Sequence, residues 1–301
     1  MRPVLAVLTV LILSVLPACG QAPKPKPDAA GSVWLVESPT TKLYLCGTIH
    51  LLRESDFPLS AAYDVAYADA QKLVFELPPG SARDPQLAIK MQTAGTFEKG
   101  KSLADMISAS TLDALDSWAK RRGLTAGQLD QFKPWFVALT VSMVEYTALG
   151  ADPNRGVDYF FEKRAAKDGK PGEGLETIDF QLGLFTSLTQ EEQRELLEQT
   201  LHEVRTLPEI FEKMITSWRN GEADALHQML FEEAEKYPGL MEKFLTQRNA
   251  HWMKHLEGYL AGKENTMVLV GTGHLGGKGG VLDLLKTKGY KVSRVLAPRK
   301  P

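Results

Sequence analysis

The sequence is poor in cysteine and has no excess of charge of either sign. Its 301 residues include two cysteines, 35 lysines and arginines, and 37 aspartates and glutamates, which gives a formal net charge of −2. A nearly neutral chain has no electrostatic reason to bind nucleic acid, so we expect no nucleic-acid partner. Cys19 follows an apolar N-terminal run and is a candidate for lipidation. If Cys19 carries a lipid, Cys46 is the only other thiol, and a disulfide framework is excluded.

Several common catalytic motifs are also missing. The chain contains no Gly-x-Ser-x-Gly, no P-loop and no Cys-x-x-Cys, which argues against the usual serine hydrolases, NTPases and thiol oxidoreductases. The composition is 44% hydrophobic and 24% charged, which is typical of a soluble globular protein. The length allows one large domain or two small ones.

Long apolar runs are scarce, and the main one, Val4–Leu16, is shorter than the ~20 residues that a membrane-spanning helix needs. It fits the apolar segment of a secretory signal peptide, which we place at residues 1–18. The segment from Leu16 to Cys19 reads Leu-Pro-Ala-Cys and resembles a bacterial lipobox, in which the cysteine is lipidated. A cleaved signal without a lipid is the alternative.

Residues 19–31 are rich in proline, alanine and lysine, so they cannot bury apolar surface and predict a flexible tether behind the lipidated cysteine. Gly20, rather than an aspartate, follows Cys19. By resemblance to the sorting rule of bacterial lipoproteins, this residue favours an anchor in the outer membrane over one in the inner membrane. We therefore expect an exported lipoprotein of the cell envelope, attached to the membrane through its N-terminal lipid and facing the periplasm. The sequence does not indicate an oligomeric state.

The rest of the chain predicts an α/β fold. Apolar and alternating segments predict a β-hairpin over 33–46, and strands over 72–77, 267–271 and 290–296, while helical periodicity covers 60–71, most of 84–150, 188–221, 239–262 and 280–288. Residues 43–77 and 267–296 each follow the order strand, loop, helix, strand, which is typical of a parallel crossover. We expect one domain over 32–298: a central mixed β-sheet built from two β-loop-α-β halves, with a large helical insertion between them.

One phrase, Gly-Thr-x-His-Leu, occurs twice, at residues 47–51 and 271–275. Each copy follows an apolar strand, and a glycine at a strand end permits close backbone approach. Ligands of parallel sheets bind beyond the carboxyl ends of the strands. We therefore expect His50 and His274 to converge on one crevice, where imidazoles can bind a metal ion or transfer protons. For either copy alone, a structural histidine is the alternative.

Two charged residues are predicted to be buried near these histidines. Glu76 ends the apolar strand over 72–77, and Arg248 lies within the apolar stripe of the helix over 240–259. A buried charge is costly unless it is paired with an opposite charge, a metal ion or hydrogen bonds. Glu76 is therefore a candidate metal ligand or general base, and Arg248 a candidate for stabilising an oxyanion. The alternatives are an exposed Glu76 and a structural pairing of Arg248 with a buried carboxylate.

Other polar residues give weaker signals. Glu176 and Gln181, in the segment GLETIDFQ, are candidates for holding a site histidine in place, although purely local roles are equally open. His251 and His255 have an i,i+4 spacing that can bind zinc, but the glutamate of His-Glu-x-x-His is absent, so we interpret the spacing as accidental. His227 stands among charged helical residues, and we expect it at the surface.

In combination, seven motifs resemble the TraB/GumN family, which is related to the Tiki metalloproteases and more distantly to erythromycin esterase and the ChaN haem-binding lipoproteins. They follow the family order across residues 33–297: GTIHLL, VFELP, KPW, GVDYFFEKRAAKDGKP, GLETIDFQ, QRNAHW and VGTGHLGGKGGVLDLLKTKGYKV. The resemblance to the Tiki enzymes implies a divalent-metal peptidase site formed by His50, His274 and Glu76. Four further family positions have less defined roles: Glu176, Gln181, Arg248 and Asn249.

Two functions from different classes follow. The first is a divalent-metal-dependent hydrolase of peptidase type, with His50, His274 and Glu76 at one site and a peptide or small molecule as substrate. Such a metal lowers the pKa of a bound water to about 7, and mixed nitrogen and oxygen ligands admit Mn, Co, Zn or Fe. The alternative is a lipoprotein that binds haem or another ligand without catalysis, with the same histidines as axial ligands.

Overall fold

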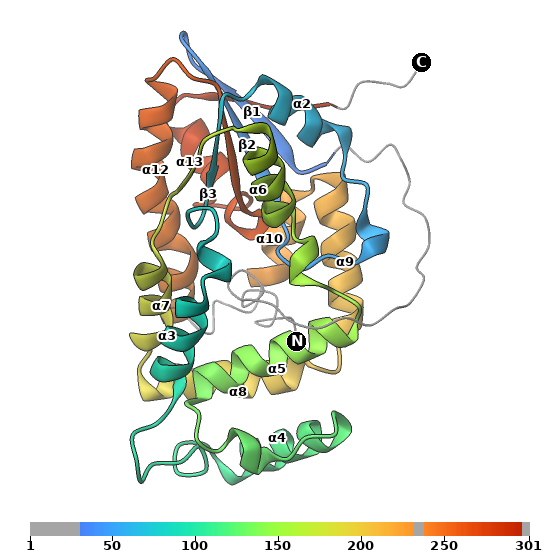
Figure 1. Cartoon of the computed structure of the whole chain (residues 1–301), viewed down its shortest axis with the longest axis vertical. Coiled ribbons are helices and arrows are strands. Elements are labelled where there is room, and N and C mark those ends of the chain that lie inside the picture. Colours follow the sequence, from blue (N-terminus) through green and yellow to red (C-terminus); the bar gives the residue numbers. More distant parts are fainter. Residues whose placement is uncertain (1–30, 232–237, 297–301) are drawn as a thin grey trace.

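The computed structural model describes residues 31–231 and 238–296 (Figure 1). The predicted signal peptide at 1–18, the lipidation site Cys19 and all but the last residue of the tether at 19–31 lie outside the described residues, so these remain predictions. Within the part of the chain that is described, no helix has the length and apolar character to cross a membrane.

A six-stranded mixed β-sheet forms the centre of the fold, in the order β4-β3-β5-β2-β1-β6. Its strands are β1 (Val33–Glu37), β2 (Lys42–Thr48), β3 (Lys72–Phe75), β4 (Gly172–Gly174), β5 (Thr266–Gly271) and β6 (Lys291–Arg294). β1 runs antiparallel to both of its neighbours, β2 and β6, whereas β2, β3, β4 and β5 are mutually parallel. The predicted α/β fold with a mixed sheet is confirmed.

The predicted crossovers are present but interleaved. α2 (Ala61–Asp69) connects β2 to β3, and α13 (Val281–Thr287) connects β5 to β6. β5 lies between β2 and β3, so a strand of the second half is inserted into the first half. Interleaving places the two Gly-Thr-x-His phrases on adjacent parallel strands, which neither half could achieve alone.

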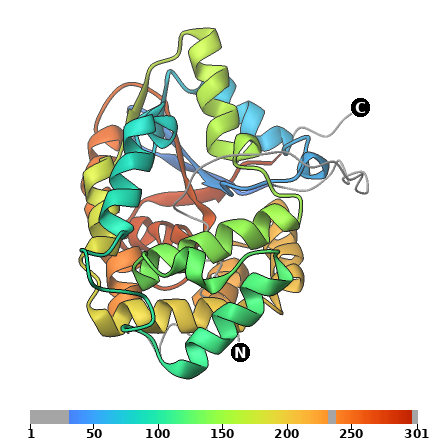
Figure 2. The same ribbon diagram turned by 60° about the horizontal axis from the view of Figure 1, so that its bottom comes forward.

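Between β3 and β5 the chain forms the predicted helical insertion. Its helices are α3 (Pro85–Gly95), α4 (Ala109–Arg121), α5 (Pro134–Ala148), α6 (Val157–Asp168), α7 (Ile178–Thr186), α8 (Gln190–Glu203), α9 (Leu207–Asn220), α10 (Ala223–Phe231), α11 (Pro238–Met241) and α12 (Gln247–Leu260). α5 and α8 run side by side beyond the sheet (Figure 1, Figure 2).

The helix expected over 188–221 is instead two helices, because Pro208 lies in the first turn of α9. Proline lacks an amide hydrogen and clashes with the preceding turn, so it is tolerated in a first turn but interrupts a helix interior.

Alternating side chains of the central strands face two different apolar cores. On β2, Leu43 and Leu45 pack with residues of α12 and α13, whereas Tyr44 and Cys46 belong to the core that includes residues of α2, α5 and α6. The sheet is therefore covered on both faces, as parallel strands require. Cys46 is fully buried, and burial raises the pKa of its thiol well above the usual value. A thiol that is buried and stays protonated is an unreactive core residue.

Candidate functional site

The two Gly-Thr-x-His phrases lie side by side. β2 and β5 pair in parallel with Thr48 opposite Gly271, and the Thr272 hydroxyl donates to the Thr48 carbonyl at 3.0 Å. A Cβ on Gly47 would lie 2.6 Å from Thr272 Oγ1, so the contact between the phrases requires glycine there. Both histidines therefore follow the carboxyl ends of neighbouring strands, where ligands of such sheets bind.

His274 is buried, and both of its ring nitrogens have partners. Arg248 Nη1 lies 3.0 Å from His274 Nε2, and Asn249 Oδ1 lies 2.7 Å from His274 Nδ1. Because a guanidinium can only donate, Nε2 is the acceptor, and Nδ1 carries the proton and donates to Asn249. Burial and then the positive charge of Arg248 hold the pKa of His274 well below its ordinary value. His274 is therefore a neutral imidazole in a closed setting.

Arg248 organises this buried cluster. Its guanidinium pairs with Glu176 through Nε at 2.8 Å and Nη2 at 2.9 Å, and Nη2 also donates to Glu76 at 2.6 Å. Glu176 accepts further hydrogen bonds from Gln181 Nε2 and Trp252 Nε1. The four family positions of less defined role thus belong to one network, in which Glu176 and Gln181 hold Arg248, while Arg248 and Asn249 hold His274.

Glu76 lies just past the end of β3, where it is buried. Its Oε1 accepts the amide hydrogen of Gly271 at 2.7 Å, and its Oε2 accepts from Arg248. Each carboxylate oxygen has two lone pairs, so one on each oxygen is not used by these two bonds. Glu76 also lines a cavity that His50 shares, and its charge helps to raise the pKa of His50.

His50 has the opposite environment from His274. Its side chain is 20% exposed, and its Nδ1 lies 2.9 Å from Asp158 Oδ1 at the start of α6. Burial disfavours the charged ring, but the carboxylates of Asp158 and, to a smaller extent, Glu76 together outweigh burial and raise the pKa of His50 to about 9. His50 Nε2 is buried and has no hydrogen-bond partner among residues 31–231 and 238–296. This nitrogen is the open atom of the site.

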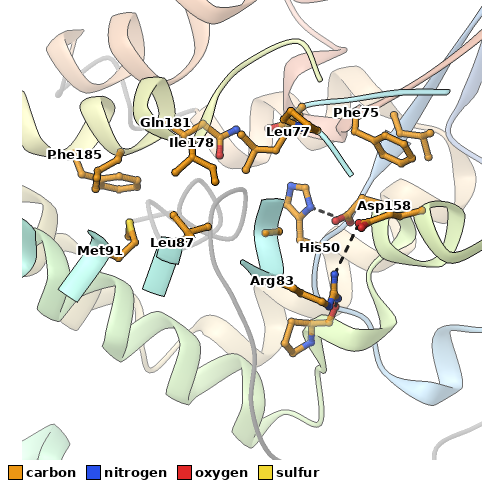
Figure 3. Close-up of a pocket in the computed structure, with 17 residues that line it drawn as sticks. His50, Phe75, Leu77, Arg83, Leu87, Met91, Asp158, Ile178, Gln181 and Phe185 are labelled. Carbon is orange, nitrogen blue, oxygen red and sulfur yellow. Dashed lines mark hydrogen bonds and ion pairs between the residues drawn. The ribbon is translucent and has the colours of Figure 1, made fainter. Parts of the chain in front are cut away.

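A cavity of about 100 Å³ lies at His50, between the strand ends and helices α3, α6 and α7 (Figure 3). In Figure 3, His50, Asp158 and Arg83 lie at one end of it, and Met91 and Phe185 lie at the other. Part of the helical insertion therefore covers the carboxyl ends of the parallel strands and encloses the open imidazole.

Three residues at this cavity were missed by the sequence reasoning: Asp158, Glu162 and Arg83. Asp158 and Glu162 are four residues apart and so share one face of α6, a spacing that marks a carboxylate pair. Gly156 precedes α6, and a Cβ there would lie 2.5 Å from the His50 carbonyl oxygen. The glycine lets the start of α6 approach His50.

The remaining histidines of interest lie outside this cavity. His251 is exposed on α12, and its ring centroid lies 5.3 Å from that of His255. His227 was expected at the surface, but this prediction was wrong: the residue is half-buried, with Nδ1 3.3 Å from the Gly273 carbonyl. The Gly-rich turn after His274 packs on α10 and covers the His227 ring. The contact is close, since a Cβ on Gly277 would lie 2.1 Å from that ring.

The predicted ligand set fits a metal ion only in part. Across the described residues, no three His, Cys, Asp or Glu side chains are grouped as they would be around a metal ion. Arg248 bridges two of the predicted ligands, Glu76 and His274. His50 Nε2 and the free lone pairs of Glu76 are the atoms that fit a cation, whereas His274 could join them only if Arg248 moved.

The sequence profile of the TraB/PrgY/gumN family matches residues 32–294. The chain is also 22% identical over 246 residues to uncharacterized protein YbaP of Escherichia coli strain K12, an alignment that spans 81% of this chain and 87% of that protein. YbaP of Shigella flexneri matches with the same identity and coverage. No solved structure matches the chain.

Proposed function

The chain belongs to the TraB/PrgY/gumN family, and we propose that it is an exported, divalent-metal-dependent hydrolase that works at the His50 cavity. The single observation that supports this function is the buried, unpartnered Nε2 of His50 beside Glu76, as judged over the described part of the chain. A histidine whose other nitrogen faces a carboxylate is the usual arrangement of a metal-binding imidazole. It is equally the arrangement of a general base.

The charges around His50 favour a bound cation. Asp158, Glu76 and Glu176 are three carboxylates, and Arg248 is the guanidinium that pairs with two of them. Without the proton of His50, these four groups sum to two negative charges, and the charges of Arg83 and Glu162 at the same cavity cancel. At neutral pH the raised pKa places a proton on His50, and a metal ion bound at this ring would replace that proton. A divalent cation held by His50 and Glu76 would balance that excess, and when bound it would activate a water molecule for attack on a carbonyl or similar group.

The chain's own residues then have distinct roles. Asp158 fixes the ring of His50, and in the neutral ring it favours the tautomer whose Nε2 lone pair faces the cavity. Arg248 and the Gly271 amide fix the Glu76 carboxylate, so that its remaining lone pairs can receive a proton from the attacking water. The apolar walls of the cavity keep bulk water away, which strengthens these electrostatic interactions.

The test is calorimetric titration of Mn²⁺, Co²⁺ and Zn²⁺ into the metal-free chain and three variants. We expect His50→Ala and Glu76→Gln to weaken binding of the preferred ion at least tenfold. His251→Ala is the matched control and should bind normally, because His251 is exposed on α12 away from the cavity. Loss of binding in His251→Ala alone would assign the ion to the His251–His255 pair and reject the proposal, as would the absence of binding.

The alternative function is ligand binding without catalysis, for which the open imidazole beside apolar walls is the supporting observation. Haem is the probe. A sharp Soret shift that disappears in His50→Ala would favour binding over hydrolysis, and no shift is expected for the hydrolase.

We also propose that Cys19 anchors the chain in the cell envelope. In a bacterial host, labelling with an alkyne-tagged palmitate should mark the chain, and Cys19→Ser should abolish the label. Equal labelling of both would reject lipidation at this residue.

A further inference from the structure

The cavity at His50 has a second end that the chemistry proposed above does not use. This end is lined by Leu87 and Met91 of α3 and by Ile178, Leu182 and Phe185 of α7. Figure 3 shows Met91 and Phe185 at the end opposite His50 and Asp158. The cavity is therefore polar at the imidazole and apolar beyond it.

Native interiors are closely packed, and an unfilled apolar cavity costs stability. An apolar cavity that opens beside a reactive group is instead typical of a binding site. The apolar end also contains no counter-charge among the described residues, because the charged lining residues His50, Glu76, Arg83, Asp158 and Glu162 come from other elements. A charged ligand group there would be buried without a partner, which is unfavourable.

We propose that Leu87, Met91 and Phe185 bind the uncharged apolar part of an acyl group whose ester or amide bond is hydrolysed at His50. This inference rests on the proposed hydrolase function and adds its substrate class. In the reaction, the oxygen of water adds to the carbonyl carbon, and the bond from that carbon to the leaving oxygen or nitrogen breaks. The leaving group takes the proton, which gives a carboxylic acid and an alcohol or amine.

Two sources supply this chemistry: the acyl chain of an ester, and the apolar side chain of a peptide residue. One arm of the experiment therefore uses p-nitrophenyl esters from acetate to dodecanoate. The other uses p-nitroanilides of glycine, alanine, leucine, phenylalanine and glutamate. If the substrate is an ester, kcat/KM of the ester series should rise about threefold to fourfold with each methylene that the cavity accommodates, and if it is a peptide, the anilide series should show this rise. The glutamate anilide should have one of the lowest values of kcat/KM.

Substitutions on α3 test the position of the apolar group. Met91→Phe narrows the apolar end and should reduce kcat/KM for the longest accepted group at least tenfold, while acetate or glycine substrates change less than twofold. Ile89→Phe is the matched control, because Ile89 lies on the same helix but is 55% exposed. Equal effects of the two substitutions, or rates independent of the apolar group, would overturn the inference and leave the hydrolase proposal intact.

A binding measurement separates the two proposals. Trp135 is fully buried and stacks on Phe185 with ring centroids 5.3 Å apart, so an apolar ligand at Phe185 should change its fluorescence. Titration with uncharged amides from acetamide to decanamide should give affinities that increase with chain length and that Met91→Phe weakens. Such binding without hydrolysis of any substrate would support the apolar site and reject the hydrolase, whereas no chain-length dependence would reject the apolar site.

Discussion

His50 and His274 occupy equivalent places in two copies of one phrase, at the ends of adjacent parallel strands, yet they have opposite chemistry. His50 faces a carboxylate, which raises its pKa to about 9, and its Nε2 lies at a cavity. His274 faces a guanidinium, and its pKa is well below the ordinary value. The difference shows that the strand end sets the position of an imidazole, while the charge of its neighbour sets its protonation and availability.

The neighbours come from different layers of the fold. Asp158 belongs to α6, on one face of the sheet, and Arg248 belongs to α12, on the other. The histidines of the two Gly-Thr-x-His phrases therefore differ because each contacts a helix on a different face of the sheet. His50 is suited to chemistry, and His274 to fixing the buried network that holds Glu76.

The largest change in stability should come from removing Arg248, the buried cation beside His274. Arg248→Met leaves the Glu76 and Glu176 carboxylates buried without their partner, so we expect a loss of about 3–5 kcal/mol in the free energy of unfolding. Urea unfolding measures it.

Arg155→Met is the control for that substitution, since the Arg155 side chain is 40% exposed and its partners Glu54 and Asp152 are 84% and 38% exposed. A change within about 0.5 kcal/mol is expected there. A cost below about 1 kcal/mol for Arg248→Met would mean that the cluster does not depend on its guanidinium.

The next effect concerns the pKa of His50 and its consequence for stability. The folded pKa of about 9 exceeds the ordinary 6.5, which corresponds to roughly 3.5 kcal/mol of stability at about 1.4 kcal/mol per pKa unit. This stabilisation is complete below pH 6.5 and is lost as the pH rises from there to about 9. Unfolding by urea across that range should show the decrease.

Asp158→Asn isolates the cause of the raised pKa. Burial of the ring remains while the Asp158 carboxylate is removed and only the Glu76 charge still opposes burial, so the pKa of His50 should fall well below 9. The histidine ring signals in NMR titrations measure the pKa of His50. Asp179→Asn is the control, because it removes an exposed carboxylate and should leave the pKa of His50 unchanged. A His50 pKa that stays near 9 in Asp158→Asn would exclude Asp158 as the cause.

A third substitution would make His274 resemble His50. Asn249→Asp places a carboxylate against His274 Nδ1, so the pKa of His274 should rise. The substitution also removes the amide that donates to the Gly279 carbonyl at 3.0 Å, and a loss of about 1–3 kcal/mol in stability is expected. NMR titration is the measurement, with His50 as an internal reference. If the pKa of His274 does not rise in Asn249→Asp, the Arg248 guanidinium rather than the residue at position 249 determines that pKa.

The smallest effect should come from the threonines of the two phrases. Thr272→Val removes the hydrogen bond to the Thr48 carbonyl and should cost about 1 kcal/mol. The equivalent hydroxyl, Thr48 Oγ1, is buried without a partner in the described part of the chain, so Thr48→Val should change stability by less than about 0.5 kcal/mol. Thermal or urea unfolding distinguishes them, and equal costs would contradict the asymmetry.

Most of the fold could be predicted because its signals are local. Apolar strands, the prolines at Pro39 and Pro134, and the hydroxyl caps at Ser60 and Thr177 mark elements that the structure contains. The break at Pro208 was present in the sequence and was missed because the apolar periodicity continues across it. The pairing of Asp158 with His50 carried no local signal, since α6 and β2 are distant in sequence and meet only through tertiary packing.

The sequence alone determined that two histidines follow the carboxyl ends of parallel strands, because strand ends and glycine turns are encoded over a few residues. Only the tertiary structure decided which histidine keeps an open nitrogen. That choice depends on whether a carboxylate from α6 or a guanidinium from α12 reaches the ring, and electrostatic interactions at a few ångströms depend on packing rather than on sequence spacing.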